Sequence, residues 1–357
     1  MSNAEKFNIR PLTLSEIATV KTLAELGSTG HTAKFPSPPI TGTFSSTLRN
    51  NFQEHFFVAT NARIYISENI CLVITEDNRF FPQSFPKSWP YEALASKDEV
   101  GLSVPTKDLK ISHLPGTWVS PFTMTDNPHL YHSLMDNYGR LVWLDGLDPA
   151  INVARPIAAA MTPVATSIHH AFMSHRNSRD LSPGLYHVDR VIIPPPGNRE
   201  DRLFHNVVQF VQETLVKKFN IGKYKHKSRL YISRADTALR NLSNEPELIS
   251  ALRKKGFIAL CPGNFSLQAQ LELFASAEMI VGVHGMGLMP MIVASDCKRV
   301  IEYEALLWPG TAFSGLAAIM GMQYHGLGCE LIVDERNNGA HWIGKADIEQ
   351  TLALLES

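Results

Sequence analysis

The chain has 357 residues, a hydrophobic content of 44% and a charged content of 19%, values typical of a soluble globular protein with two domains. Its formal net charge of −1 lacks the basic excess expected of a nucleic-acid-binding protein, so no nucleic-acid partner is predicted. The cysteines show no CxxC spacing, and neither a zinc site nor a disulfide framework is expected. They are Cys71, Cys261, Cys297 and Cys329.

The first part of the chain is expected to contain an extension and then short strands. Residues 1–50 are rich in Thr, Ser and Pro and are interpreted as an N-terminal extension with a helix near Leu12–Leu26. No signal peptide is visible, and no apolar run approaches the roughly 20 residues that a membrane span needs. Between Phe56 and Phe122, β-prone runs separated by turn residues predict a small antiparallel layer.

The stretch Asn127–Leu144 contains the first candidate catalytic residues. If it is helical, His132 and Asp136 lie four residues apart and share one face. An imidazole and a carboxylate placed in this way can serve as a base and its orienting partner. The alternative is a hydrogen-bonded polar helix face without catalytic function, because the neighbouring leucines also follow helical spacing.

Other histidines follow in the first half, at positions 169, 170, 175 and 187. Because no HExxH or HxH pattern occurs, isolated histidines are expected here and no metal site is predicted. A strand that ends in a proline run before Gly197 indicates a stiff connection between domains. We therefore predict an N-terminal acceptor-side lobe over residues 51–198, a C-terminal lobe over 199–345 and a closing helix over 346–357.

From Arg199 onward, strands and helices alternate regularly. An amphipathic helix of about 18 residues begins near Leu203. Pro246 and Gly256 mark the two ends of a later helix, and Ser266 caps the next one. The intervening strands are RLYIS, FIAL, MIVGV and RVIEY. This alternation predicts βαβ units and a parallel sheet, which is a Rossmann-like domain.

Ligands of an open parallel sheet bind beyond the C-terminal ends of its strands, at helix N-termini. The candidate nucleotide-binding residues in these loops are Ser233, Arg234, Arg240, Asn264, His284, Gly285, Met286, Gly287 and Glu302. Two arginines, a histidine and bare backbone amides suit a nucleotide diphosphate held without a metal ion. For each arginine alone, a surface salt bridge explains the sequence equally well.

Two further patterns are ambiguous. Glu302 and Glu304 form a Glu-x-Glu pair at a strand end, and we interpret Glu302 as a ribose-hydroxyl acceptor, with a structural salt bridge as the alternative. The basic run Lys223–Arg229 is interpreted as a solvated linker, with attraction of an anionic substrate or a membrane surface as the alternative. Neither a P-loop nor a GxGxxG motif occurs, which removes the main support for an ATPase or a dinucleotide enzyme. There is also no Asp-x-Asp motif of the kind that holds a divalent ion against a sugar nucleotide.

The runs RLYISRADTALRNLSNEPEL, FSLQAQLELFASAEMIVGVHGMGL and VIEY resemble the inverting glycosyltransferase family 61, as does the earlier segment LYHSLMD. The residues at the family's motif positions are Tyr131, His132, Asp136, Arg234, Arg240, Asn244, Glu245, His284, Gly285, Gly287 and Glu302. The resemblance covers about Asn127 to Tyr324 and is strongest over Arg229 to Tyr303.

This resemblance implies a GT-B arrangement of two Rossmann-like lobes, with the donor nucleotide in the C-terminal lobe and the acceptor in the cleft between them. It also implies metal-independent transfer, with inversion, from a nucleotide sugar, usually a UDP-sugar. His132 or Asp136 would act as the base or hold the acceptor, and the arginines and His284 would stabilise the leaving diphosphate. The family's HGAGLTN reads HGMGLMP here, so Met286 is expected to narrow the donor pocket.

Because no anchor is visible, a bacterial cytoplasmic enzyme of surface polysaccharide synthesis is expected, either free or peripherally associated with the inner face of the membrane. Its partners would be a nucleotide-sugar donor and a glycan acceptor, and no cofactor is expected. A nucleotide-sugar hydrolase or epimerase and a catalytically silent sugar-nucleotide-binding protein are the alternatives. The sugar, the acceptor, the linkage and the oligomeric state are left open by the sequence.

Overall fold

The computed structural model describes residues 6–11, 57–67, 71–76, 79–80, 102–105, 110–122, 130–146, 151–157, 162–194, 202–222, 224, 226–305, 311–334 and 342–356. The fold is mixed α/β, and the chain divides into two compact units, Met1–Val211 and Gln212–Ser357. This division falls within helix α4, Arg202–Lys218, which is the amphipathic helix that the sequence predicts. The predicted helix near Leu12–Leu26 lies outside the described residues, and the predicted domain boundaries stay predictions.

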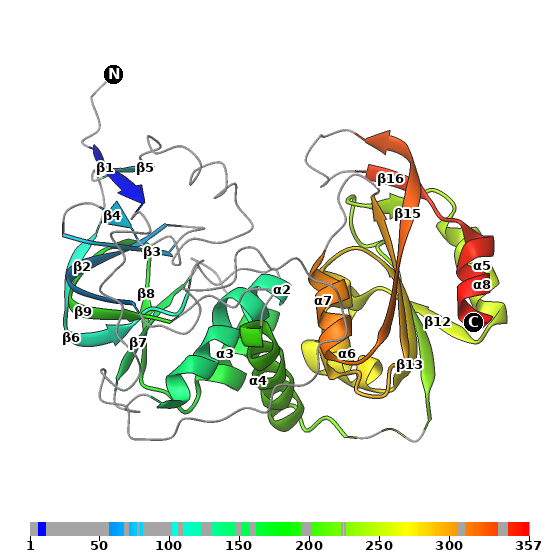
Figure 1. The fold of residues 1–357 in the computed structure, drawn as a ribbon, viewed down its shortest axis with the longest axis horizontal. Helices are drawn as coiled ribbons and strands as arrows, with labels where there is room; N and C mark the ends of the chain where they lie inside the picture. Colours follow the sequence, from blue (N-terminus) through cyan, green and yellow to red (C-terminus); the bar gives the residue numbers. More distant parts are fainter. Residues whose placement is uncertain are drawn as a thin grey trace. The chain divides into compact units, whose positions relative to one another are not determined.

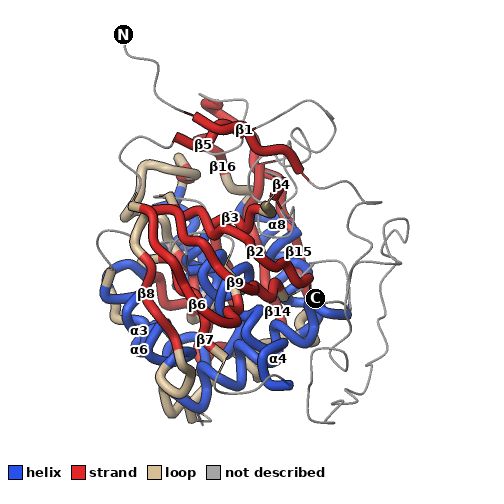
Figure 2. Tube along the Cα trace, turned by 90° about the vertical axis from the view of Figure 1, so that its left-hand side faces the viewer, coloured by secondary structure: helices blue, strands red, loops and turns tan. Residues whose placement is uncertain are grey.

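The described strands of the first unit form one mixed sheet in the order β5-β1-β4-β3-β2-β9-β6-β7-β8 (Figures 1 and 2). They are β1 Lys6–Pro11, β2 Phe57–Ile66, β3 Cys71–Ile74, β4 Arg79–Phe80, β5 Leu102–Pro105, β6 Ile111–Val119, β7 Asn152–Pro156, β8 Ser178–Leu181 and β9 Gly184–Ile193. The predicted antiparallel pairing holds for β2, β3 and β4. It is wrong for β6, which pairs in parallel with β7 and β9, because long crossover connections allow parallel neighbours.

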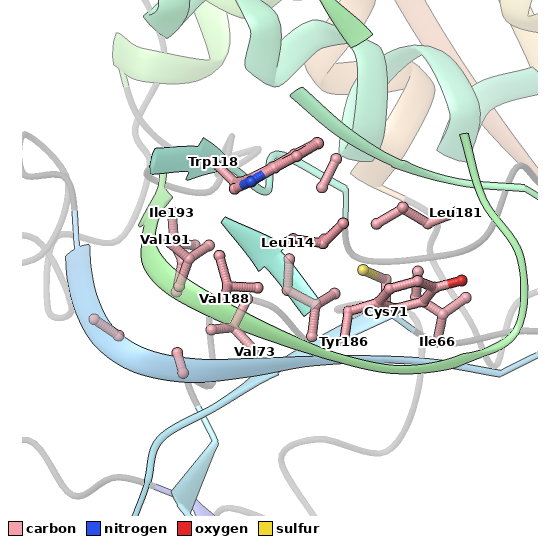
Figure 3. Packing of buried hydrophobic residues seen from close by; sticks show 14 residues of the cluster. Ile66, Cys71, Val73, Leu114, Trp118, Leu181, Tyr186, Val188, Val191 and Ile193 are labelled. Carbon is pink, nitrogen blue, oxygen red and sulfur yellow. The ribbon is translucent and has the colours of Figure 1, made fainter. Parts of the chain in front are cut away.

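One face of this sheet forms the core of the first unit. Alternate residues of β2, namely Ala62, Ile64 and Ile66, are fully buried, as the two-residue period of a strand requires. They belong to a cluster that also contains Trp118 and Val188 (Figure 3). This core supports the ends of β6 and β7. The first candidate residues, His132 and Asp136, lie in the segment of the sequence between these two strands.

The segment after β6 is helical but not one regular helix. It consists of the short helix α2 (Leu130–His132), a π-helical turn (Ser133–Asn137) and a 3₁₀ segment (Tyr138–Gly146). The helix α3, Pro163–Met173, follows β7, and the Thr162 side chain caps it. A π-helical turn inside a helix often marks a functional site, and here it contains Asp136.

Gly139 allows α4 to pack closely against this segment. A Cβ at Gly139 would lie 2.5 Å from Val207 Cγ1 and 2.8 Å from the Leu134 carbonyl oxygen. We expect Gly139→Ala to lower the free energy of unfolding by about 1–3 kcal/mol, because overpacking forces the backbone apart. Urea unfolding should show this loss, whereas Gly222→Ala should behave as wild type, since no atom lies within 4 Å of its Cβ position. Equal stability of the two variants would contradict the packing argument.

The described residues of the second unit include a seven-stranded sheet in the order β11-β16-β15-β14-β13-β10-β12. Its strands are β10 Ser228–Ile232, β11 Asn241–Leu242, β12 Phe257–Leu260, β13 Ala277–Val283, β14 Arg299–Ala305, β15 Gln323–Asp334 and β16 Trp342–Lys345. Its helices are α5 Glu245–Lys254, α6 Leu267–Ala275, α7 Thr311–Ile319 and α8 Ile348–Glu356. The predicted alternation of strands and helices is therefore confirmed, whereas β11 and β16 were not predicted.

Local signals in the second unit are also borne out, with one exception. The Ser266 hydroxyl caps α6 by accepting from the Ala269 amide at 3.3 Å, and Gly256 follows α5 with a φ of +82°. Between β13 and β14, where the alternation of strands and helices predicts a helix, the chain forms a 3₁₀ segment, Met286–Val293. The cause is Pro290 inside it, because proline lacks an amide hydrogen and clashes with the preceding turn of an α-helix.

The strand order of the second unit places a ligand site at a defined point. The parallel strands follow the order β12-β10-β13-β14-β15, so the chain moves first to one side of β10 and later to the other. Helices α5 and α8 cover one face of the sheet, and α6 and α7 cover the other (Figure 1). In sheets of this type, ligands bind beyond the C-terminal ends of the strands where the order reverses, which here is between β10 and β13.

Candidate functional site

The loops that follow β10, β12 and β13 meet at this point. A Cβ at Gly287 would lie 3.2 Å from Ile232 Cγ2 and 3.3 Å from Pro262 Cγ. A Cβ at Gly263 would lie 2.6 Å from Asp236 Oδ2. The glycines thus let three loops approach one another closely, and the three loops that the sequence indicated lie together in the structure.

Two arginines lie in these loops. Arg234 Nε donates to the Leu239 carbonyl oxygen at 2.9 Å, and a Cβ at Gly285 would lie only 1.7 Å from Arg234 Nη1. Arg240, whose backbone φ is +61°, directs Nη1 to the His284 carbonyl oxygen at 3.4 Å. Among the residues that the structure describes, neither guanidinium forms an ion pair with a carboxylate.

The electrostatics of the two arginines are unfavourable without a ligand. Burial lowers the pKa of Arg234 to about 10, and the positive charge of Arg240 acts in the same direction, while the charge of Asp236 opposes both. Burial also lowers the pKa of Arg240, opposed by the charge of Glu302. Because desolvated like charges repel, a polyvalent anion is the kind of ligand that the two guanidinium groups could hold together.

A histidine with a fixed orientation stands at the end of β13. His284 Nδ1 lies 2.6 Å from Glu302 Oε1, and the two side chains are 28% and 0% exposed. Gly282 and Glu302 are register partners on β13 and β14, which brings the two groups together. The imidazole also contacts the ring of Phe313 edge-on. A carboxylate on Nδ1 fixes the tautomer of a histidine, so Nε2 is the ring atom left for a ligand.

Glu302 lies between two hydrogen-bonding side chains. Its side chain is fully buried, Oε1 accepts from His284, and Oε2 accepts from the Tyr324 hydroxyl at 2.6 Å. These contacts favour the structural alternative of a buried ion pair with His284, and the role of Glu302 as a ribose-hydroxyl acceptor stays a prediction. Tyr324 was missed, since only the parallel pairing of β14 with β15 brings it to the two glutamates.

The remaining predicted residues have smaller roles in the geometry. The Ser233 hydroxyl is buried and accepts from the Ala235 amide at 3.1 Å, so it shapes the loop after β10. Asn264 is exposed at the end of the 3₁₀ turn Pro262–Asn264. Met286 is half-buried at the start of the 3₁₀ segment after β13, whereas Met289 is fully buried. Among the residues that differ from the family pattern, Met286 is therefore the one nearest the surface of this site.

His284, Glu302 and Glu304 offer ligand atoms that lie within 4.8 Å of one another, a group that could hold a metal ion. In the structure, these groups are joined by hydrogen bonds: Tyr324 contacts both glutamates, and His284 contacts Glu302. The prediction that the site works without a metal stays a prediction.

The first unit contains the second group of candidate residues. His132 Nδ1 lies 2.6 Å from Asp136 Oδ2, and the side chains are only 15% and 16% exposed. The predicted pairing is confirmed, although the turn between the two residues is π-helical. Arg140, which the sequence reasoning missed, is fully buried. Burial lowers its pKa to about 10, and the charge of Asp136 opposes this shift. Asp136 thus lies between an imidazole and a buried cation.

Three further expectations from the sequence concern the basic run, the cysteines and membrane-spanning helices. Two cations of the run Lys223–Arg229 have carboxylate partners: Lys227 pairs with Asp296, and Arg229 pairs with Glu278 at 2.7 Å. These pairs favour the interpretation of the run as a solvated segment. The four cysteines are free. No helix in the described part of the chain is long and apolar enough to cross a membrane.

Comparison with protein families identifies the chain as a glycosyltransferase. The model of Glycosyltransferase 61 matches residues 54–301, which is more than half of the chain. The chain therefore belongs to glycosyltransferase family 61. This membership implies a nucleotide-sugar donor and a glycan acceptor as its kinds of partner. No curated protein gives a significant match.

Two solved structures show distant similarity to the chain. One is the bacterial iron-containing dodecameric glycosyltransferase TibC from enterotoxigenic E. coli H10407, with 10% identity, coverage of 82% of this chain and 85% of that one, and a TM-score of 0.31. The other is the dodecameric iron-containing heptosyltransferase TibC in complex with ADP-D-beta-D-heptose, with 10% identity, coverage of 80% and 84%, and a TM-score of 0.30. Similarity at this level defines neither a donor nor a metal for this chain.

Proposed function

We propose that this enzyme transfers a sugar, with inversion and without a metal ion, from a UDP-sugar to a glycan acceptor in surface polysaccharide synthesis. The GT-B organisation and a location at the cytoplasmic side of the membrane are parts of this proposal. The observation that supports it most is the pair of largely buried arginines, Arg234 and Arg240, which lie at the switch point of a parallel sheet. Among the described residues, neither forms an ion pair with a carboxylate. A nucleoside diphosphate would supply negatively charged oxygens to which both guanidinium groups can donate hydrogen bonds.

The residues of the second unit would stabilise the departing diphosphate. As the bond between the anomeric carbon and the diphosphate oxygen breaks, negative charge develops on that oxygen. The guanidinium groups of Arg234 and Arg240, His284 Nε2 and the amides near Gly285 and Gly287 are the donors available to receive this charge. Fixed donors aimed at a developing charge are the strongest electrostatic contribution that an enzyme makes.

The first unit would supply the base, and the geometry favours His132 over Asp136 for this role. Asp136 already contacts His132 Nδ1 and is close to the charge of Arg140, so it orients the imidazole. The acceptor hydroxyl would give its proton to His132 Nε2 while its oxygen bonds to the anomeric carbon. Attack opposite the leaving diphosphate inverts the configuration of the sugar.

A thermal-shift screen against nucleoside diphosphates and nucleotide sugars, in the presence of a chelator, is the first test. A ligand at a hundred times its dissociation constant adds about 2.7 kcal/mol to the stability of the folded protein. Product analysis with the stabilising donor and a panel of glycan acceptors then separates the alternatives. A glycosylated acceptor supports the proposal, whereas free sugar or an epimerised donor indicates a hydrolase or an epimerase, and binding without turnover indicates a silent binder.

Gly285 offers a conservative test of the anion site. In Gly285→Ala the new methyl group would displace the Arg234 guanidinium, since Nη1 lies 1.7 Å from the Cβ position. Loss of one charge-assisted hydrogen bond, worth about 1.5–3 kcal/mol, should weaken UDP binding on the order of 10-fold or more. Calorimetric titration of this variant beside Gly222→Ala checks the expectation, and equal affinities would contradict it.

A further inference from the structure

One carboxylate lies among the loops proposed to hold the diphosphate. These loops are residues 233–240, 261–266 and 284–287, and Asp236 is their only acidic residue. Asp236 is exposed, and its negative charge opposes the fall in the pKa of Arg234. A Cβ at Gly263 would lie 2.6 Å from Asp236 Oδ2. The carboxylate therefore lies against the loop after β12, beside one arginine of the proposed anion site.

The position of Asp236 is fixed by hydrogen bonds within its own loop. The Thr237 amide donates to the Arg234 carbonyl oxygen at 3.0 Å and closes a turn in which Asp236 is the third residue. The rest of the loop is closed by Arg234 Nε, which donates to the Leu239 carbonyl oxygen at 2.9 Å, and by Asn241 Nδ2, which donates to the Thr237 carbonyl oxygen at 3.0 Å. A loop that is already ordered loses less conformational entropy when a ligand binds.

The oxygens of Asp236 are available to a ligand. Within the described part of the chain, this carboxylate accepts no hydrogen bond and forms no ion pair. A carboxylate can only accept hydrogen bonds, and it repels a phosphate group. The ligand group that fits it is therefore a hydroxyl. In a nucleoside diphosphate, the ribose next to the phosphates carries two vicinal hydroxyls, and the two oxygens of one carboxylate can accept from both.

The other carboxylate considered for this role is already engaged. Glu302, which the sequence favours as the ribose-hydroxyl acceptor, contacts His284 with Oε1 and Tyr324 with Oε2, both at 2.6 Å, and its side chain is fully buried. Asp236 differs from it in both respects, because it is exposed and its oxygens are unoccupied by the described residues.

We propose that Asp236 accepts hydrogen bonds from the 2′- and 3′-hydroxyls of the donor ribose, and that it thereby selects a ribonucleotide at the anion site. This inference rests on the proposed function. The diphosphate would lie on Arg234 and Arg240, and the ribose would lie toward the loop after β12. Gly263, which has no side chain, leaves room for the carboxylate at this place. In the alternative, Asp236 only moderates the positive charge of the arginines.

Two substitutions separate these alternatives, because Asp236→Ala and Asp236→Asn both remove the charge and only asparagine keeps an oxygen that can accept from a hydroxyl. In calorimetric titrations, both variants should bind pyrophosphate equally, and at least as tightly as the wild type. Relative to pyrophosphate, Asp236→Ala should lose on the order of 10-fold or more in affinity for UDP, and Asp236→Asn should lose less. Glu278→Ala should match the wild type with both ligands, because Glu278 is at the start of β13, where it pairs with Arg229.

A deoxynucleotide tests the hydroxyl contact directly. The wild type and Glu278→Ala should bind UDP more tightly than 2′-deoxy-UDP, whereas Asp236→Ala should bind the two alike. The role of Asp236 would be overturned by equal UDP affinities of Asp236→Ala and Asp236→Asn, or by a preference for UDP that persists in Asp236→Ala. If the wild type binds no UDP at all, the proposed function itself fails, and this inference fails with it.

Discussion

Arg234→Ala is expected to reduce the transfer rate on the order of 10²-fold or more, because it removes a charged donor to the departing diphosphate. The variant should also bind UDP much more weakly, since Arg240 alone would have to balance the diphosphate charge. The folded state should stay nearly as stable without ligand. The substitution removes one of two like charges that burial and mutual repulsion already destabilise, together with the hydrogen bond from Arg234 to the Leu239 carbonyl oxygen.

Arg229→Ala is the matched control for this experiment. Arg229 lies on β10, the strand that precedes the loop of Arg234. Its side chain is 38% exposed, and its guanidinium pairs with Glu278. Removing a partly exposed ion pair changes stability by about 1 kcal/mol or less, and transfer should stay near the wild-type rate. Full activity in Arg234→Ala, or an equal loss in both variants, would remove the anion site from the mechanism.

His132→Ala is expected to lower the transfer rate by about 10²- to 10⁴-fold, the usual contribution of a general base. Affinity for UDP should be unchanged, because the residues proposed to bind the diphosphate lie in the second unit. Asp136→Asn should lower the rate as well, since an amide no longer fixes the tautomer of the imidazole or balances the charge of Arg140. Steady-state kinetics together with UDP titration separate the two effects.

The first unit contains its own control for this prediction. His113 Nε2 and Asp189 Oδ1 form another histidine–aspartate pair at 2.7 Å, with side chains 59% and 53% exposed. His113→Ala should leave both rate and affinity near wild type, because an exposed pair of this kind neither orients a base nor is shielded from water. A large loss of activity in His113→Ala, or none in His132→Ala, would argue against His132 as the base.

The second unit was predictable because its signals are local. Each strand is a short apolar run followed by a helix with recognisable ends, such as Gly256 and Ser266, and right-handed crossovers leave few topologies open. The donor loops then follow from the rule that ligands lie at the ends of parallel strands. The arginines, His284 and the glycines could therefore be selected from the sequence alone.

The first unit and the inner residues of the site depend on contacts between distant positions. The parallel pairing of β6 with β9 joins segments that a helix and other strands separate, and no local pattern encodes it. His132 and Asp136 were found because they lie four positions apart in the sequence. Tyr324 on β15 contacts Glu302 on the neighbouring strand β14. The contact can therefore be recognised only once the register of the sheet is known.

Calorimetric titration of the protein with UDP in the presence of a chelator tests the central claim most directly. The account predicts saturable binding to the wild-type protein, binding of similar strength to Arg229→Ala, and loss of most of the affinity in Arg234→Ala. The account would be contradicted if no saturable binding occurred without divalent cations, or if Arg234→Ala bound UDP as tightly as the wild type.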